Sequence, residues 1–288
     1  MNINVKCQYC KSERVVKRGL SPTANRGKQQ RYLCRDCDKT FIQDLGFWKM
    51  KNSEKIITRS IDAYFSNLSS RKMRDHLARH DETKISHVSV LDWCRKYVLK
   101  VQKYVNQLQP TLSGQYYADE TEIDRRRNKD IFWCSVDWGS RYINATLYSP
   151  LSQNMGDAKE FMQRMKKSGI PAYIQTDGLP QYPRAFRKTF GQGNRTIRTE
   201  HRVNNVSKSK KHNVRIETVF SKIKDRVHDF RGLKALWSAP ILLAGIVLQH
   251  NFIQNHTTTK KLPCELAGIK ISTEPNRWLE MIKVSYAH

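Results

Sequence analysis

The sequence predicts a multidomain α+β protein with three unlike parts in chain order: a small cysteine-rich segment, a helical module and a mixed α/β domain. Three observations support this division. Two closely spaced cysteine pairs lie near the N-terminus, helical spacing of apolar residues dominates positions 51–110, and strand and helix patterns alternate over positions 113–258. The chain of 288 residues is long enough for two or three domains, and we expect residues 259–288 to form a C-terminal tail.

The chain is strongly basic along its whole length. It has 52 Lys and Arg residues against 26 Asp and Glu residues, a formal net charge of +26. Such an excess repels itself, and it predicts a polyanionic partner. Because no single amphipathic helix carries the charge, nucleic acid is favoured over a membrane surface. The most apolar run, residues 239–248, is too short to cross a membrane, and the N-terminus lacks an apolar signal core, so we expect a cytoplasmic location.

Four of the seven cysteines form two Cys-x-x-Cys pairs, and 23 residues separate Cys7 and Cys10 from Cys34 and Cys37. Each pair can form a tight turn that offers two thiolates, and two such pairs complete a tetrahedral zinc site. In a reducing compartment this spacing favours one structural Zn²⁺ over disulfides, the alternatives being scattered structural thiols or a redox pair. We therefore predict a zinc ribbon over residues 1–44, with a hairpin between the pairs and short strands around the second pair.

The apolar spacing over residues 51–110 predicts three short helices with polar breaks between them, as in a helix-turn-helix module. The third helix begins near Val88 and carries Arg95 and Lys96, which we expect to contact DNA. From Leu91 to Leu108 its apolar positions recur at steps of three and four, a heptad-like seam. This seam could form a dimer interface. The alternative is a plain three-helix bundle whose long helix packs on the next domain.

The region 113–258 has the order of a mixed sheet with helices on its faces. Three strand patterns with a tight turn between the second and third predict an antiparallel meander. The expected elements after the meander are a helix, a strand, a second helix, a possible fifth strand and two long helices. The strands are predicted at 115–121, 131–137, 142–148, 172–175 and 196–198, and the helices at 155–168, 183–190, 214–229 and 239–255.

Three acids occupy positions from which they can converge. Asp119 lies at the end of the first predicted strand, Asp177 directly follows the fourth, and Glu217 lies in the first turns of a long helix. Three carboxylates repel one another unless cations neutralise them, and hard oxygen ligands suit Mg²⁺ or Mn²⁺. Two such ions serve in-line phosphoryl transfer. The alternative is that these residues are ordinary surface acids.

The residues around the acids form an ordered set of motifs, Tyr117-Ala-Asp119-Glu-Thr, Gln175-Thr-Asp177-Gly and Asn213-Val-Arg-Ile-Glu217. This set, with the stretches that follow it, resembles the DDE catalytic core of prokaryotic insertion-sequence transposases over roughly residues 115–270. The resemblance implies a retroviral-integrase-like, RNase H-like fold in which the first and fourth strands are neighbours. It also implies that the three acids hold two Mg²⁺ or Mn²⁺ ions in each active site. A zinc ribbon and a helix-turn-helix in front are similar to family members as well.

Two functions are compatible with these features. The resemblance implies a transposase that binds the terminal inverted repeats of its own element, hydrolyses phosphodiester bonds and transfers the freed 3′-hydroxyl to target DNA. Its partner would be double-stranded DNA, and pairing of two ends would require a homodimer or higher oligomer. The competing hypothesis is a non-catalytic, domesticated DNA-binding protein that keeps the same scaffold.

Asp177 and Glu217 are separated by 39 residues, somewhat more than is common in the family that the sequence resembles. The surplus lies in a basic stretch whose Lys208, Lys210 and Lys211 we expect to contact DNA. Glu200, directly before this stretch, is a rival for the third acid position.

The first acid position also has rivals, Glu120 and Glu122, since a strand alternates its faces and only one parity can point inward. Asp137 matches no catalytic position of the family, so we expect a structural role for it. Lys224 lies seven residues after Glu217, which on a helix is an offset of about 20°. We therefore expect Lys224 to contact a DNA phosphate beside the metal site, and the alternative is a solvated lysine.

Overall fold

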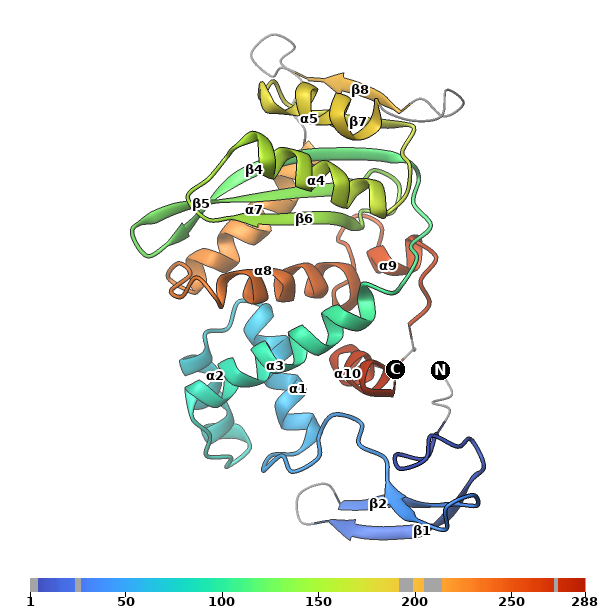
Figure 1. Ribbon diagram of the computed structural model, residues 1–288. Helices are drawn as coiled ribbons and strands as arrows, with labels where there is room; N and C mark the ends of the chain where they lie inside the picture. The colour runs from blue at the N-terminus through green and yellow to red at the C-terminus, as the bar shows by residue number, and fades with distance from the viewer. Residues whose placement is uncertain (1–4, 24–26, 192–198, 205–213, 272–273, 288) are drawn as a thin grey trace. The chain divides into compact units, whose positions relative to one another are not determined.

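The structure, a computed structural model, describes residues 5–23, 27–191, 199–204, 214–271 and 274–287 (Figure 1). The chain divides into two compact units. Unit 1 comprises Met1–Tyr64, Ser70–Gln107 and Ile271–His288, and unit 2 comprises Phe65–Ser69 and Leu108–Lys270. The predicted strand at 196–198 and the basic stretch with Lys208, Lys210 and Lys211 lie outside the described residues.

The N-terminal part of unit 1 is a three-stranded antiparallel sheet in the order β1-β2-β3. Its strands are β1 (Val15–Thr23), β2 (Gly27–Cys34) and β3 (Thr40–Ile42). The apolar core is small: Phe41 is buried with Cys7 and Cys34, and the ring of Tyr32 stacks on Phe41 at 5.8 Å. A core of this size supplies little stability by itself, so a bound metal would contribute much of it. The predicted hairpin and flanking strands are confirmed.

Three helices follow, α1 (Glu54–Phe65), α2 (Ser70–His80) and α3 (His87–Val105). The side chain of Ser86 caps α3 by accepting a hydrogen bond from the backbone N–H of Val88. On α3, the seam residues Cys94, Val98 and Val101 are at most 1% exposed. The central residues of the seam are therefore buried within a single chain and are not available for a dimer interface.

The C-terminal residues contain two helices where the sequence was expected to form a tail. Helix α9 (Pro263–Leu266) belongs to unit 2, and α10 (Arg277–Ala287) packs on α3 in unit 1. Lys283 of α10 forms an ion pair with Glu54 at 3.0 Å, and the ring of Tyr286 lies 6.5 Å from that of Tyr97. Because Trp278 and Ile282 are buried on one side of α10, this segment completes the helical core of unit 1.

Unit 2 is built on a five-stranded mixed sheet in the order β6-β5-β4-β7-β8. The strands are β4 (Gln115–Arg125), β5 (Asn128–Asp137), β6 (Ile143–Ser149), β7 (Tyr173–Thr176) and β8 (Glu200–Val203). β4, β5 and β6 are antiparallel, whereas β7 is parallel to both β4 and β8. The predicted meander is confirmed, and the first and fourth strands of this unit are neighbours as expected. The RNase H-like mixed α/β architecture follows from this order.

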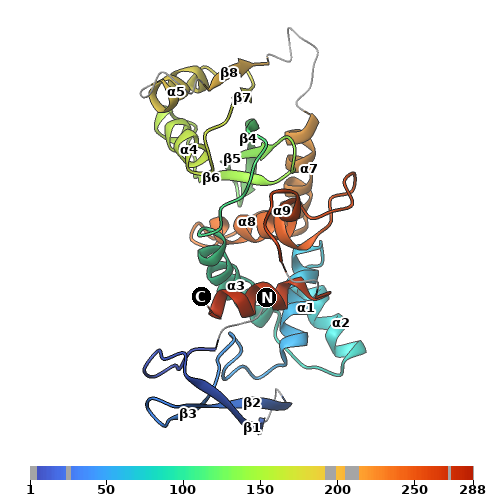
Figure 2. The ribbon, with the colours of Figure 1, turned by 90° about the vertical axis from the view of Figure 1, so that its right-hand side faces the viewer.

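Helices cover both faces of the sheet (Figure 2). Helices α4 (Met155–Lys167) and α5 (Gln181–Phe190) pack on one face, where Trp133 lies between Phe161 and Tyr182. Helix α7 (Val214–Asp229) contacts β4 and β5 from the other face. It is followed by α8 (Ala239–Leu248) and the π-helical turn η1 (Gln249–Ile253). Within the described parts of the chain, no helix combines the length and apolar character that a bilayer crossing requires.

Candidate active site

The parallel pairing of β4 with β7 places Asp119 beside Asp177. Tyr117 pairs with Gln175 in this parallel arrangement. Asp119 and Asp177 each come two residues later in the chain, so they lie at matching positions. Both are half-buried, and oxygen atoms of the two carboxylates lie within 4.8 Å of each other. Asp119 lies in the middle of β4 and not at its end, contrary to expectation, because pairing with β5 continues the strand to Arg125.

Glu217 and Lys224 lie close enough to Asp119 for their charges to shift its pKa. Burial and the negative charge of Asp177 raise the pKa of Asp119 to about 7, with Glu217 acting in the same direction and Lys224 in the opposite one. Glu217 itself is exposed in the first turn of α7, outside the set of oxygens that lie within 4.8 Å of one another. The structure thus joins two of the predicted acids closely and brings the third into their electrostatic neighbourhood.

Glu120 is a further carboxylate at this position, which the sequence analysis weighed only as a rival for Asp119. Its oxygens accept hydrogen bonds from the Tyr182 hydroxyl at 2.5 Å and the Gln153 amide at 2.8 Å. Burial raises the pKa of Glu120 to about 7, and the charges of Asp177 and Asp119 contribute to this rise against the hydrogen bond from Tyr182. An oxygen of Glu120 lies within 4.8 Å of oxygens of both aspartates. No sequence pattern places it there, since Tyr182 belongs to a helix 62 residues away.

The remaining acidic rivals lie outside this cluster. Glu122 is exposed on β4, and Glu200 forms a 2.7 Å ion pair with Arg202 on the exposed strand β8. Asp137 is fully buried, and its carboxylate accepts hydrogen bonds from the hydroxyls of Ser113 at 2.6 Å and Ser140 at 2.7 Å. Asp137 therefore fixes the turn after β5, in agreement with the structural role expected for it.

The carboxylate cluster has the chemistry of a divalent-cation site. The carboxylates of Asp119, Glu120 and Asp177 lie within 4.8 Å of one another, and their hard oxygen donors suit Mg²⁺ or Mn²⁺. Burial and mutual repulsion raise the pKa values of Asp119 and Glu120. Burial disfavours the charged forms, and a bound cation would offset this cost. The residues present therefore fit the metal that the DDE pattern implies.

The four N-terminal thiols form a second metal site. The sulfur atoms of Cys7 and Cys37 are 3.6 Å apart, those of Cys10 and Cys34 are 3.5 Å apart, and all four lie within 4.8 Å. Tetrahedral zinc with Zn–S bonds of about 2.3 Å would separate its sulfurs by about 3.8 Å. The backbone N–H of Tyr9 points to the sulfur of Cys7 at 3.4 Å, as in a tight metal-binding turn. The thiols are therefore arranged as a zinc-binding cluster.

The described basic residues that were expected to contact DNA belong to two helices. On α3, Arg95 is half-buried and pairs with Asp92 at 3.3 Å, whereas Lys96 is exposed with its ammonium over the ring of Tyr97. On α7, Lys224 is exposed and its charge lowers the pKa of Asp119. Lys224 belongs to the same unit as the acids, and it lies near enough to Asp119 to act on its charge.

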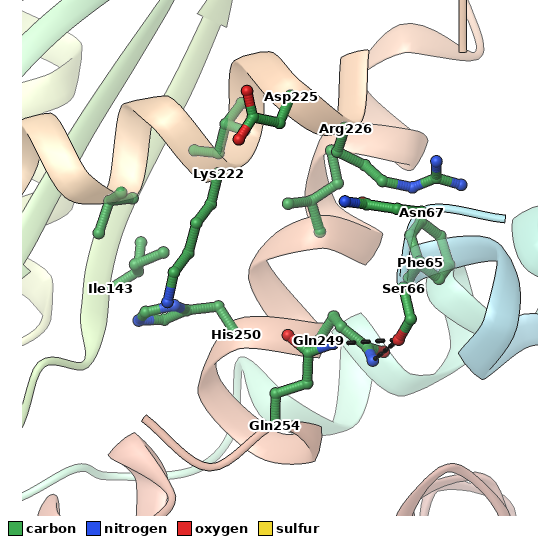
Figure 3. A pocket seen from close by; sticks show the side chains of 13 residues that line it. Phe65, Ser66, Asn67, Ile143, Lys222, Asp225, Arg226, Gln249, His250 and Gln254 are labelled. Carbon is green, nitrogen blue, oxygen red and sulfur yellow. Dashed lines mark hydrogen bonds between the residues drawn. The ribbon is translucent and has the colours of Figure 1, made fainter. Parts of the chain in front are cut away.

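A cavity of about 230 Å³, lined by both polar and apolar side chains, lies elsewhere in unit 2, between α7, η1 and residues 65–67 (Figure 3). Its lining includes Lys222 and His250 but none of the acids of the cluster. The Nε2–H of His250 donates a hydrogen bond to the carbonyl oxygen of Arg141 at 2.9 Å. Burial lowers the pKa of His250 to about 4 despite this bond, and the charge of Lys222 acts in the same direction. The His250 side chain at this cavity is therefore neutral at pH 7 and holds the backbone at Arg141.

We expect His250 to make unit 2 sensitive to acid. Its pKa is lowered from 6.5 to about 4, so between these values the unfolded chain binds a proton that the folded chain does not. Its contribution to stability is complete above pH 6.5 and is lost as the pH falls towards 4. Between pH 7 and 5 the wild type should lose about 2 kcal/mol more unfolding free energy than His250→Gln, as measured by urea titration. If the two proteins lost the same unfolding free energy, the pKa of His250 in the folded protein would be close to its ordinary value.

The mixed α/β part of the chain matches a known protein family. A protein family described as a DDE domain matches residues 113–256, which is half of the chain. None of the curated proteins matches it.

Three of the solved structures that this chain is similar to are an integrase core domain, an intasome and a transpososome. The HTLV-2 integrase catalytic core domain in complex with magnesium is 16% identical, with a TM-score of 0.41 over 56% of this chain and 98% of its own. The simian T-cell lymphotropic virus intasome in complex with the PP2A regulatory subunit B56 gamma is 14% identical, with a TM-score of 0.39 over 69% of each chain. A pre-cleavage Mos1 transpososome is 10% identical, with a TM-score of 0.34 over 79% of this chain and 78% of its own.

The family match begins just before β4 and ends just after η1, so it spans the sheet, the acid cluster and α7. It includes Asp119, Asp177 and Glu217 in the order that the motifs require. The zinc-binding cysteine cluster lies in front of it. This chain belongs to the DDE-type transposases.

Proposed function

We propose that this chain is an active transposase that binds the terminal inverted repeats of its own insertion sequence, cleaves DNA at those ends and joins the freed 3′-hydroxyl to target DNA. The observation that carries the proposal is the register of β4 with β7, which sets Asp119 against Asp177 with Glu217 nearby. We further propose that the protein acts on double-stranded DNA in the cytoplasm and that two copies or more hold a pair of ends together.

Asp119, Asp177 and Glu217 are the residues that would hold Mg²⁺ or Mn²⁺. Two such ions would supply an activated water or 3′-hydroxyl nucleophile and neutralise the leaving oxygen. The chain itself contributes position: β4 and β7 fix the two aspartates through a rigid sheet, and α7 supplies Glu217 with Lys224 two turns further on. The alternation of β4 turns Glu120 towards Tyr182 and Gln153, so we infer that Glu120 orients the strand at Asp119.

A supercoiled plasmid that carries the inverted repeats flanking the gene tests the proposal. With Mg²⁺, the protein should cut this plasmid at the repeat boundary and produce joined DNA, while a plasmid without the repeats should stay intact. The competing hypothesis of a non-catalytic DNA-binding protein predicts binding to the repeats without cleavage in either Mg²⁺ or Mn²⁺. That outcome would replace the proposal.

Lys224→Ala should impair joining more than end binding. The side chain lies two turns after Glu217, about 10 Å along the helix, on nearly the same face. A phosphate contact from this position should align the DNA with the acids, so we expect joining to fall about tenfold and the salt slope of binding to fall by about one. Joining rates and affinities across a salt series measure both effects.

Lys222→Ala is the matched control, because Lys222 is on the same helix and lines the cavity that contains His250. It should leave both quantities near their wild-type values. If Lys224→Ala behaved like this control, Lys224 would be a solvated surface lysine.

A further inference from the structure

A row of aromatic and arginine side chains crosses the sheet of unit 2 next to the acids. We name this row the aromatic row, and it consists of Arg141, Trp138, Tyr117, Tyr173 and Arg202. The indole of Trp138 stacks on Tyr117 at 4.8 Å, and Tyr117 meets Tyr173 edge to face at 6.2 Å. The guanidinium of Arg202 lies 3.8 Å from the ring centre of Tyr173, and that of Arg141 lies 5.5 Å from the centre of Trp138. An arginine therefore closes each end of the row.

Strand register explains why these side chains form a row. Gln115 of β4 pairs with Tyr173 of β7, and its carbonyl accepts the backbone N–H of Trp138 after β5. Gln175, two residues after Tyr173, pairs with both Tyr117 and Arg202. Neighbouring positions on four adjacent segments thus point to one face of the sheet.

The same face carries the acid pair. Tyr117 and Asp119 are two residues apart on β4, so their side chains point in the same direction, about 7 Å apart along the strand. Asp177 follows Tyr173 and Gln175 with the same parity. The aromatic row therefore adjoins the acid pair on the side of the N-terminal ends of β4 and β7.

The aromatic row is accessible, in contrast to the opposite face of the same strands. Trp138 is 36% exposed, and the side chain of Arg202 is 47% exposed. Tyr116 and Ile174, which have the opposite parity, are at most 1% exposed in the core beneath α4 and α5. The row thus presents ring surface and positive charge to solvent immediately beside the carboxylates.

The two arginines are held in place while retaining hydrogen-bond donors. Arg202 stacks on Tyr173 and donates to Glu200 at 2.7 Å, and Arg141 stacks on Trp138 and donates to its carbonyl oxygen. A guanidinium has five N–H donors in a planar fork, so donors remain for a phosphate. Aromatic rings between such donors suit nucleotides whose bases are not covered by a partner strand.

We propose that the aromatic row binds unpaired nucleotides of the DNA strand next to the bond that the acid pair acts on. The rings of Trp138 and its neighbours contact the bases, and Arg141 and Arg202 contact the phosphates. This proposal rests on the proposed function, since it assigns a DNA subsite to the same active site. It requires a DNA end to open locally before it reaches the carboxylates.

The test compares two labelled DNA ends that differ only in a few terminal nucleotides. One is a fully paired duplex, and the other has the same length with mismatched, unpaired terminal nucleotides. Affinities of the full-length protein are measured by fluorescence anisotropy without Mg²⁺, so that no chemistry occurs. The wild type should bind the opened end about tenfold more tightly, at the lower end of what stacking one base contributes. Arg202→Met and Trp138→Leu should reduce this preference to less than about twofold.

Arg164→Met is the matched control. Arg164 also forms a 2.7 Å ion pair with a glutamate, Glu160, and its side chain is 44% exposed, but it lies on α4 over the opposite face. It should keep the full preference while losing the same charge. Thermal unfolding of all three variants identifies any that fail to fold, and either of Arg202→Met or Trp138→Leu suffices for the comparison.

Equal wild-type affinity for the two ends, or equal loss of preference in Arg164→Met and Arg202→Met, would overturn the proposal. Plasmid cleavage separates this result from a failure of the proposed function. If the wild type cleaves the repeats without preferring opened ends, the aromatic row is not a nucleotide subsite and the transposase proposal stands. If it prefers opened ends but cleaves no DNA, the row binds nucleotides and the catalytic proposal fails.

Discussion

Asp119→Asn and Asp177→Asn should each lower DNA cleavage and joining about a thousandfold, and Glu217→Gln should do the same. Each change keeps the shape of the side chain and removes one anionic group. Asp119 and Asp177 belong to the carboxylate cluster, and Glu217 lies near enough to raise the pKa of Asp119. A bound ion contributes several kcal/mol of transition-state stabilisation, and about 4 kcal/mol corresponds to this factor. Binding of the DNA ends, measured in parallel, should change little, because the expected end-binding residues lie elsewhere in the chain.

Glu122→Gln is the control for these three variants. Glu122 is an exposed acid on the same strand as Asp119 and is not part of the carboxylate cluster. It should retain nearly wild-type cleavage and joining. Should one of the three variants behave like Glu122→Gln, that acid would be removed from the metal site, and Glu120 would become the first residue to test in its place.

Removal of zinc should unfold the N-terminal ribbon and leave the catalytic sheet folded. The four sulfurs lie at separations that suit tetrahedral zinc, and the ribbon has only a small apolar core. Structural zinc contributes an apparent 10–16 kcal/mol, roughly, in small zinc domains, far more than this core can replace. We expect one zinc per chain by elemental analysis, and chelation should weaken DNA binding. Hydrogen exchange should show loss of protection confined to residues 1–44.

Cys7→Ser should abolish zinc binding, and Cys264→Ser should not. Both cysteines are fully buried, but Cys264 lies in α9, outside the cluster. The comparison therefore separates loss of a ligand from loss of a buried thiol. Protein purified without chelator that contains no zinc would contradict the assignment of the ribbon.

The order of strands in unit 2 was predictable because a short run of apolar residues marks each strand in the sequence. The tight turn that follows Asp137 predicts that the second and third strands pair as part of an antiparallel meander. The length of β4 was not predictable, because its second half, Glu120–Arg125, is rich in charged residues that imitate a strand end. Pairing with β5 carries the strand through these residues, and such pairing is a long-range property. The same holds for α10, which packs on α3 and forms an ion pair with Glu54 of α1, both of them distant in the sequence.

The candidate site was predictable to the extent that motifs mark it. Asp119 and Asp177 could be paired from the sequence once the resemblance implied that their strands are neighbours. The place of Glu120 could not, because it depends on Tyr182 of α5. Nor could the aromatic row, because Trp138, Tyr117 and Tyr173 meet only through the register of three chain segments. Contacts across strands are decided by tertiary pairing, on which a single sequence carries little information.

Anomalous diffraction from crystals of the full chain soaked in Mn²⁺ tests the central claim most directly. The account predicts manganese bound by carboxylate oxygens of Asp119, Asp177 and Glu217, with the signal lost in crystals of Asp177→Asn. Manganese held by Asp119, Glu120 and Asp177 with Glu217 turned away would contradict the assigned triad. Absence of manganese from the wild-type cluster, with the ion bound elsewhere in the crystal, would contradict the metal-dependent mechanism itself.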